Sequence, residues 1–160
     1  MPLGRTKRAI ESVWSYPRPP RIAFDTRSVV VEIDGITLAE SDHSLRVLET
    51  SHPPVFYLPA ESVDVTRLQS SGRTTFCEFK GTARYWDLLS PRVISQVAWC
   101  YPKPTPGFER IADWIAFYPS KATCTLDGEL VVPQPGDFYG GWITSDVKGP
   151  FKGSPGTTTW

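Results

Sequence analysis

Two side chains could carry acid–base chemistry in this sequence: the carboxylate of Glu49 and the amine of Lys80. If residues 44–50 form a strand, alternation puts Glu49 on the same face as two apolar neighbours. A carboxylate on an apolar face is either paired with a cation, here Arg84 or Lys80, or desolvated and suited to general acid or base catalysis. Glu49 is therefore the first catalytic candidate.

Lys80 is the second catalytic candidate, because it stands beside Gly81, where a strand can bend or approach a neighbour closely. An ammonium group at such a bend can hold an anionic ligand group, with Arg46 as a second anchor, or can act as a base if it is desolvated. The alternative is an ordinary ion pair with Glu49 or Glu78.

Aromatic residues accompany both candidates along the chain, and they could wall a pocket for a flat or apolar ligand. The alternative is that they pack in the core, as aromatic side chains of strands commonly do. The residues expected to bind a small-molecule ligand are Arg46, Tyr57, Cys77, Tyr85, Trp86, Trp99 and Tyr101.

Histidine chemistry is not expected, since His43 and His52 are the only histidines. A triad of His52 and Glu49 with Cys77 or Ser51 as the nucleophile can be drawn, but nothing in the spacing supports it. Two prolines follow His52, so we expect a turn there and a solvated side chain.

The motifs that bind common cofactors are absent from the sequence. It has no Gly-x-x-x-x-Gly-Lys-Ser/Thr loop for a triphosphate and no Gly-x-Gly-x-x-Gly between a strand and a helix. It also has no Cys-x-x-Cys pair, which a structural zinc site would need along with further soft ligands. We therefore expect neither a metal nor another cofactor.

Length and charge set the class of protein. A chain of 160 residues fits one domain that spans residues 1–160. Lys and Arg together number 17, as do Asp and Glu, so no net field attracts nucleic acid, and small neutral or zwitterionic ligands fit better. A homodimer is possible.

Cysteine usage and hydropathy favour a cytoplasmic protein. Cys77, Cys100 and Cys124 are an odd number at wide spacing, typical of reduced thiols. Residues 1–10 are basic but are not followed by an apolar run, so no secretion signal is expected. No apolar stretch approaches the ~20 residues that span a bilayer, so no membrane association is expected either.

Short strands dominate the expected secondary structure, because 16 prolines and 12 glycines interrupt the chain. Residues 28–40 and 122–132 each predict a hairpin about an Asp-Gly pair, which tolerates the positive φ angles of a type I′ turn. Apolar periodicity predicts one short helix over residues 107–115. Five further strands are expected, over residues 44–50, 55–58, 74–80, 83–88 and 93–101.

The two ends are expected to wrap around this β core of residues 28–132. Residues 12–27 and 133–160 hold much of the Pro/Gly punctuation, yet they also contain Trp14, Phe138, Tyr139, Trp142 and Trp160. Disordered tails rarely carry so many aromatic residues, so both ends should pack on the domain.

Several separated motifs resemble one known family. They are SVWSYPRPP (12–20), RVLETSHPP (46–54), CEFKGTARYW (77–86), AWCYP (98–102), AFYP (116–119), DG (127–128), FYGGW (138–142) and GPFKG (149–153). Over nearly its whole length the chain resembles the bacterial family catalogued as domain of unknown function 427, which is sometimes labelled nucleotidyltransferase-like.

The resemblance implies a β-tent fold, shared with methionine-R-sulfoxide reductases, in which strands splay over a ligand-accessible groove. Zinc-bearing members of that fold use Cys-x-x-Cys pairs, which this chain lacks. Nucleotidyl transfer is not expected, because it needs a Gly-Ser loop followed by paired acidic residues that hold metal at the phosphates. Gly153 and Ser154 precede Pro155 here, and no acidic residue follows.

Three functions stay open at this point. The favoured one is a metal-independent enzyme that acts on a small polar or aromatic metabolite through Glu49 and Lys80. The second is a protein that binds a small molecule without turnover. The third is a structural or partner-binding module whose Pro/Gly-rich ends form the contact surface.

Overall fold

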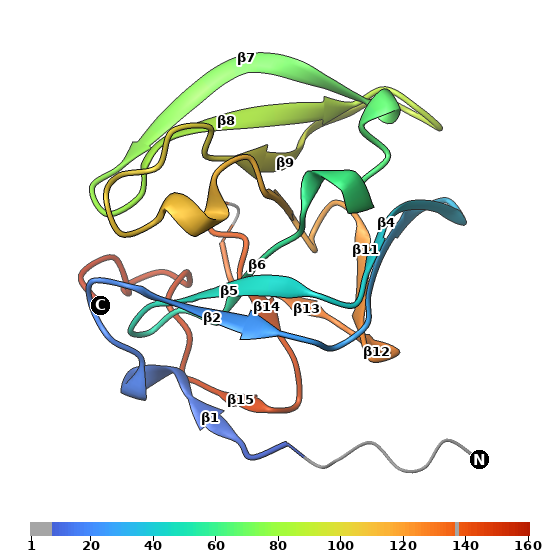
Figure 1. The fold of residues 1–160 in the computed structure, drawn as a ribbon. Helices are drawn as coiled ribbons and strands as arrows, with labels where there is room; N and C mark the ends of the chain where they lie inside the picture. The colour runs from blue at the N-terminus through green and yellow to red at the C-terminus, as the bar shows by residue number, and fades with distance from the viewer. Residues whose placement is uncertain (1–7, 137) are drawn as a thin grey trace.

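Short antiparallel strands make up most of the chain, as the sequence predicts. The computed structural model describes residues 8–136 and 138–160, and it is 46% strand and 8% helical, with no helix of seven residues or more (Figure 1). Residues 1–7, on which most of the secretion-signal expectation rests, and residue 137 lie outside the described part. The mostly β prediction is confirmed, while the likeness to β-tent folds stays a prediction.

Three sheets form the body of the structure, and all their strand pairs are antiparallel. The first has the order β10-β9-β8-β7, the second β2-β5-β6 and the third β12-β11-β3-β4. Their strands are β7 (Leu68–Cys77), β8 (Gly81–Leu88), β9 (Ile94–Cys100), β10 (Ile115–Phe117), β2 (Arg21–Asp25), β5 (Ser44–Leu48), β6 (Val55–Tyr57), β3 (Val29–Ile33), β4 (Ile36–Ser41), β11 (Thr123–Leu126) and β12 (Glu129–Leu130).

Small elements complete the fold. An antiparallel pair joins β13 and β14, and a parallel pair joins β1 to β15, so these two strands, far apart in the sequence, lie side by side in the lower part of Figure 1. These elements are β1 (Glu11–Ser12), β13 (Val132–Pro133), β14 (Trp142–Ile143), β15 (Val147–Lys148) and the 3₁₀ helices η1 (Val13–Ser15), η2 (Ala60–Ser62), η3 (Val65–Arg67) and η4 (Glu109–Ile111).

Both predicted hairpins are present. In the first, β3 pairs with β4 around Asp34 (φ 50°) and Gly35 (φ 77°). In the second, β11 pairs with β12 around Asp127 (φ 49°) and Gly128 (φ 81°). Both residues of each turn have positive φ, which is the reason for the Asp-Gly pairs.

Two elements differ in detail from the sequence-based expectations. The short helix expected over residues 107–115 is present only as η4, three residues of 3₁₀ structure that end at Ile111, and Ile115 already begins β10. Residues 21–25, placed before the β core in the sequence-based prediction, form β2, which pairs with β5 along its whole length. In β2, Ile22 and Ala23 are partly buried, whereas Phe24 is exposed.

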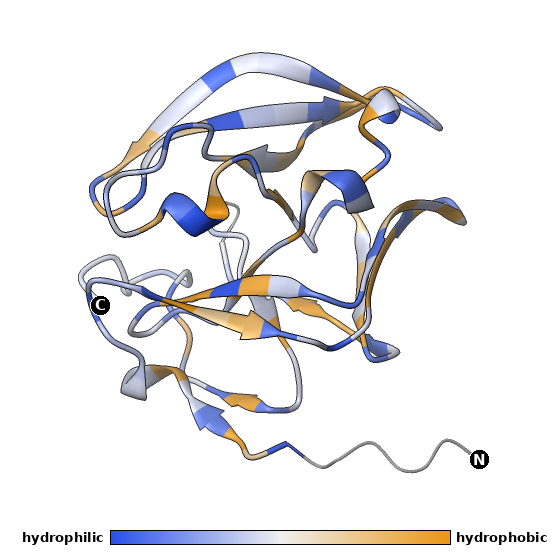
Figure 2. Cartoon of the chain, viewed as in Figure 1, coloured by the Kyte–Doolittle hydropathy of each residue, from blue (hydrophilic) through white to orange (hydrophobic). Residues whose placement is uncertain are grey.

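The buried side chains divide into two main groups on opposite sides of the first sheet. One group packs between this sheet and β3, β4 and β11, and it includes Leu38, Phe56, Val97, Phe117 and Trp142. The other lies between the first sheet and the β2-β5-β6 sheet and consists largely of aromatic residues. Figure 2 shows that β7, at the outer edge, is mostly hydrophilic or neutral, whereas β2 is largely hydrophobic. The aromatic group surrounds the site described next.

Candidate functional site

A cavity of about 230 Å³ lies between the first sheet and the β2-β5-β6 sheet. Residues of β5 to β9 form two of its walls, and a third comes from the segment of residues 134–152, which returns from the other end of the chain. Its lining consists of Val47, Glu49, His52, Val55, Tyr57, Thr75, Phe76, Cys77, Glu78, Phe79, Lys80, Tyr85, Trp99, Tyr101, Tyr118, Gln134, Phe138, Tyr139, Gly140 and Lys152.

Aromatic rings fixed by hydrogen bonds form much of the wall. Trp99 Nε1 donates to the hydroxyl of Tyr57 at 3.2 Å, and the ring of Tyr118 lies 4.5 Å from that of Trp99. The hydroxyl groups of Tyr85 and Thr75 are 2.9 Å apart. Burial raises the pKa of Tyr57 above its ordinary value, so its hydroxyl stays protonated at neutral pH. The rings therefore offer rigid faces and neutral polar edges to a ligand.

Gly140 allows the third wall to close against Trp99. A Cβ atom at this position would lie 2.1 Å from Cη2 of Trp99, which is far inside van der Waals contact. Only a residue without a side chain fits there, so the glycine brings the backbone of the returning segment directly onto the indole ring.

A buried chain of polar side chains runs along one side of the cavity, from Glu49 through His52 to Gln134. Glu49 follows β5, and its Oε2 atom lies 3.5 Å from Nε2 of His52 and 3.3 Å from Nε of Arg18. His52 is 8% exposed, and its Nδ1 atom lies 3.1 Å from Nε2 of Gln134. The expectation of a solvated His52 is wrong, because residues 134–152 fold over the turn and the ring packs against Tyr139 at 4.8 Å.

Gln134 determines which nitrogen of His52 carries the proton. The amide oxygen of Gln134 accepts a hydrogen bond from the backbone N–H of Gly141 at 3.1 Å, and its Nε2 donates to the carbonyl oxygen of Lys152 at 2.8 Å. This orientation leaves an N–H that donates to Nδ1 of His52, so Nδ1 is an acceptor and Nε2 holds the hydrogen. The neutral imidazole therefore directs its N–H toward Glu49.

Burial and the cations near the cavity keep His52 neutral. Burial, with the positive charges of Lys152, Lys80 and Arg18, lowers the pKa of His52 from 6.5 to about 3. The Nζ atom of Lys80 lies 5.7 Å from the ring centroid of Tyr101, and that of Lys152 lies 5.5 Å from the ring of Tyr139. Within the described residues no Asp or Glu carboxylate lies within 4.0 Å of Lys80 or Lys152, and Nζ of Lys152 donates to the main-chain oxygen of Trp160 at 3.4 Å.

The structure brings together most of the residues singled out from the sequence. The cavity is lined by both catalytic candidates and by Tyr57, Cys77, Tyr85, Trp99 and Tyr101. Glu49 is paired with a cation, which was one of the two interpretations of its sequence position, but the cation is Arg18 rather than Arg84 or Lys80. Lys80 follows β7 in the turn to Gly81, and it stacks on Tyr101 instead of pairing with a glutamate.

Trp86 and Arg46 do not line the cavity. Trp86 follows Tyr85 in β8 and so points to the opposite face of the sheet, where its Nε1 lies 3.4 Å from Sγ of Cys100. Arg46 alternates in the same way with the cavity residue Val47, so its side chain faces away from the cavity and is 6% exposed.

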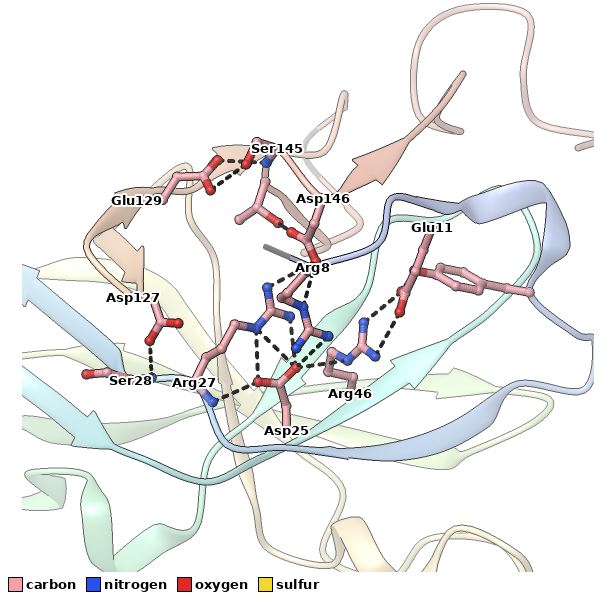
Figure 3. Close-up of polar contacts among 12 residues, drawn as sticks. Arg8, Glu11, Asp25, Arg27, Ser28, Arg46, Asp127, Glu129, Ser145 and Asp146 are labelled. Carbon is pink, nitrogen blue, oxygen red and sulfur yellow. Dashed lines mark hydrogen bonds and ion pairs between the residues drawn. The ribbon is translucent and has the colours of Figure 1, made fainter. Parts of the chain in front are cut away.

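Arg46 belongs to a buried ionic network that joins both ends of the chain (Figure 3). It donates to Glu11 at 2.9 Å, and its Nε lies 3.3 Å from Oδ2 of Asp25. Arg27 donates to Asp25 at 2.8 Å and to Asp146 at 3.0 Å. Burial alone would raise the pKa of Asp25, but the hydrogen bonds and charge of Arg27 outweigh it and lower the pKa. The network is thus charged and structural.

The residues that the sequence reading missed are His52, Gln134 and Lys152. The position of His52, between Glu49 and two prolines, could have indicated its role. A turn directly after the strand brings the side chain of His52 close to that of Glu49. No local pattern marks Gln134 or Lys152, because each reaches the cavity only through the fold of the returning segment.

Neither a metal site nor a membrane-spanning helix is found in the part of the chain that the structure describes. Over residues 8–136 and 138–160, no group of three or more His, Cys, Asp or Glu side chains could hold a metal ion. In the same residues, no helix has the length and apolar character required to cross a membrane.

Comparison with known proteins gives a family but no described activity. The family model described as a domain of unknown function (DUF427) matches residues 21–128. A search of the curated proteins finds no match. The matched stretch includes Glu49, His52 and Lys80, whereas Gln134 and Lys152 lie beyond it.

Proposed function

The chain belongs to the family of domain of unknown function 427, and on that premise we propose, from the geometry of the cavity, that it is an enzyme. Its substrate is a small, planar metabolite that carries an anionic group, and Glu49 moves a proton to or from it. The observation that carries the proposal is a set of two carboxylates, Glu49 and Glu78, and two ammonium groups, Lys80 and Lys152, in the lining of a cavity walled by tyrosine and tryptophan rings.

The walls support a small and flat substrate. Pockets that hold drug-sized ligands measure roughly 300–1,000 Å³, and the cavity here, at about 230 Å³, is smaller. The rings of Tyr57, Tyr101 and Trp99 present faces on which a planar molecule can stack. The ring centroid of Tyr57 lies 6.3 Å from that of Trp99 and 6.4 Å from that of Tyr101.

The two lysines support an anionic group on the substrate. Lys80 and Lys152 each lie over an aromatic ring, and among the described residues neither has an Asp or Glu carboxylate within 4.0 Å, although Lys152 donates to the main-chain oxygen of Trp160 at 3.4 Å. An ammonium group in a partly dry site gains more from an anionic ligand than one in open water does. His52 stays neutral and does not compete for the anion.

The contacts of Glu49 support its role in proton transfer. Both Arg18 and His52 lie near the same atom, Oε2, and within the described residues Oε1 accepts no hydrogen bond. A carboxylate in the cavity lining that keeps one oxygen without a hydrogen bond to a described residue can act as a general base.

Binding without turnover is the second candidate. The ion pair between Arg18 and Glu49, at 3.3 Å, favours it, because a paired carboxylate can also serve only to position a ligand. The free thiols Cys77, Cys100 and Cys124 fit the reducing cytoplasm in either case.

The test begins with ligand-observed NMR on a panel of small planar carboxylic acids and on any molecule that co-purifies with the chain. Each binder is then incubated with the protein in D₂O, and the incorporation of deuterium at carbon is followed. We expect Glu49→Gln to bind normally but to exchange on the order of 10²-fold more slowly. Lys80→Met should weaken binding on the order of tenfold.

Glu61→Gln is the matched control, because Glu61 is exposed and outside the cavity. It should bind and exchange like the unmodified chain. Equal catalysed exchange in Glu49→Gln and the unmodified chain would overturn the role of Glu49, and no catalysed exchange in the unmodified chain would leave binding without turnover as the better description. The absence of any planar anionic binder would overturn the proposal altogether.

A further inference from the structure

A second hollow, of about 330 Å³, adjoins the cavity. The two share Tyr85, Tyr118 and Phe138, so these three side chains form the partition between them. The second hollow is the more open of the two. Its remaining lining residues are Arg73, Gln96 and Lys121.

Basic side chains cover the tyrosines of the partition from the outer side. The guanidinium carbon of Arg73 lies 5.4 Å from the ring centroid of Tyr85, and Nζ of Lys121 lies 5.3 Å from that of Tyr118. Two rings thus have the cavity on one side and a cation on the other. No acidic side chain lines the hollow among the residues described.

Gln96 fixes Arg73 in place through an unusual backbone conformation. The pairing of β8 with β9 shifts register between Trp86 and Leu88, and opposite this irregularity Gln96 has a φ of 51°. Its backbone N–H donates to Asp87 at 2.7 Å, and its side-chain oxygen accepts from Nη1 of Arg73 at 2.8 Å. A residue other than glycine is uncommon at such a φ, and bulges of this kind often re-aim a side chain near a site.

Arg73 retains capacity to bind an anion. A guanidinium has five N–H donors, and the bond to Gln96 uses one of them at Nη1. No other hydrogen bond of its side chain to a described residue is formed. A planar fork of donors beside a neutral glutamine suits an oxyanion such as phosphate, sulfate or carboxylate, which it can bind through two parallel bonds.

We propose that the second hollow is a subsite for an anionic oxygen group at the distal end of the substrate, held by Arg73. The proposal rests on the proposed function for the near end, since the planar part of the same molecule lies in the cavity. The substrate class then narrows to elongated molecules with a planar end, a linker that passes the partition, and a second anionic group.

The test uses two series of probes, phenylalkyl phosphates and phenylalkyl carboxylates with linkers of increasing length, alongside benzoate. Affinities are measured by isothermal titration calorimetry for the unmodified chain and for Arg73→Met. We expect affinity to rise with linker length until the anion reaches Arg73, and Arg73→Met to weaken only these longer probes, on the order of tenfold. Comparison of the two series tells whether phosphate or carboxylate is preferred.

Arg110→Met is the matched control, because Arg110 is exposed and lines neither cavity. It should leave every affinity unchanged. An equal loss for benzoate and the longest phosphate in Arg73→Met, or no loss for either, would overturn the subsite.

A separate measurement distinguishes failure of the subsite from failure of the proposed function. Inorganic phosphate is titrated into ¹⁵N-labelled protein while the Nε–H signal of Arg73 and the side-chain amide of Gln96 are followed. Shifts of both signals in the unmodified chain, with the shift of the Gln96 amide lost in Arg73→Met, support the subsite, even if benzoate does not bind and the proposed function fails. Unchanged signals overturn the subsite, even if benzoate binds in the cavity.

Discussion

Buried, neutral His52 should give the protein a measurable loss of stability between pH 7 and pH 5. In the unfolded chain the ring takes up a proton as the pH falls below its ordinary pKa of 6.5, whereas the folded chain does not protonate it until about pH 3. The contribution is therefore fully present above pH 6.5 and is lost as the pH falls toward 3.

The size of the effect follows from these two values. At pH 5 the unfolded state gains a factor of roughly 30 from protonation of His52, which lowers the free energy of unfolding by about 2 kcal/mol relative to pH 7. The figure stays the same for any folded-state pKa well below 5. Carboxylates with lowered pKa values, such as Asp25 and Asp146, titrate below this range and add little to it.

The assay is urea denaturation at pH 7 and pH 5 of the unmodified chain, of His52→Asn and of His43→Asn. Asparagine at position 52 keeps an acceptor for Gln134 but cannot be protonated, so the loss of about 2 kcal/mol between the two pH values should disappear. The side chain of His43 is 45% exposed and does not line the cavity, so the loss that arises from His52 should remain in His43→Asn. A loss in His52→Asn as large as in the unmodified chain would refute the reasoning.

Three further predictions concern packing and reactivity. Arg46→Met should lower the free energy of unfolding by about 1.5–3 kcal/mol in urea denaturation, because Asp25 and Glu11 each lose one guanidinium partner while Asp25 keeps Arg27; a loss below about 0.5 kcal/mol would contradict this. Gly140→Ala should cost about 1–3 kcal/mol and shift the fluorescence of Trp99, and an unchanged spectrum and melting temperature would count against the contact. Iodoacetamide should modify Cys77 before the other two cysteines, which are buried, as mass spectrometry of the native protein would report; equal rates would contradict the cavity position of Cys77.

The elements that local sequence determines were predicted well. The Asp34–Gly35 and Asp127–Gly128 pairs specify their turns through the φ angles that they tolerate, so both hairpins are where the sequence puts them. The helix predicted over residues 107–115 is shorter in the structure than expected, because apolar periodicity over nine residues cannot distinguish a 3₁₀ turn from an α-helix. β2 was missed because its pairing with β5 is set by contacts that its own residues do not encode.

The candidate site was predicted in part for a similar reason. Alternation along β8 places Tyr85 and Trp86 on opposite faces of the sheet. The sequence-based prediction nevertheless assigned both residues to the cavity, and only Tyr85 lines it. His52 was assigned to solvent because the residues that bury it follow it by more than 80 positions, as its bond to Gln134 shows. Long-range contacts of this kind leave no trace in a local window.

The ionic network of Figure 3 also bears on the order in which the chain can fold during synthesis. The hydrogen bond between Asp25 and Arg27 joins residues two positions apart, whereas the one between Arg27 and Asp146 joins residues 119 positions apart. Asp146 is the last residue of the network to leave the ribosome, so a nascent chain holds an incomplete set of buried charges until Asp146 has emerged. We therefore expect the closing of this network to come late and to be slow, as contacts of large sequence separation generally are.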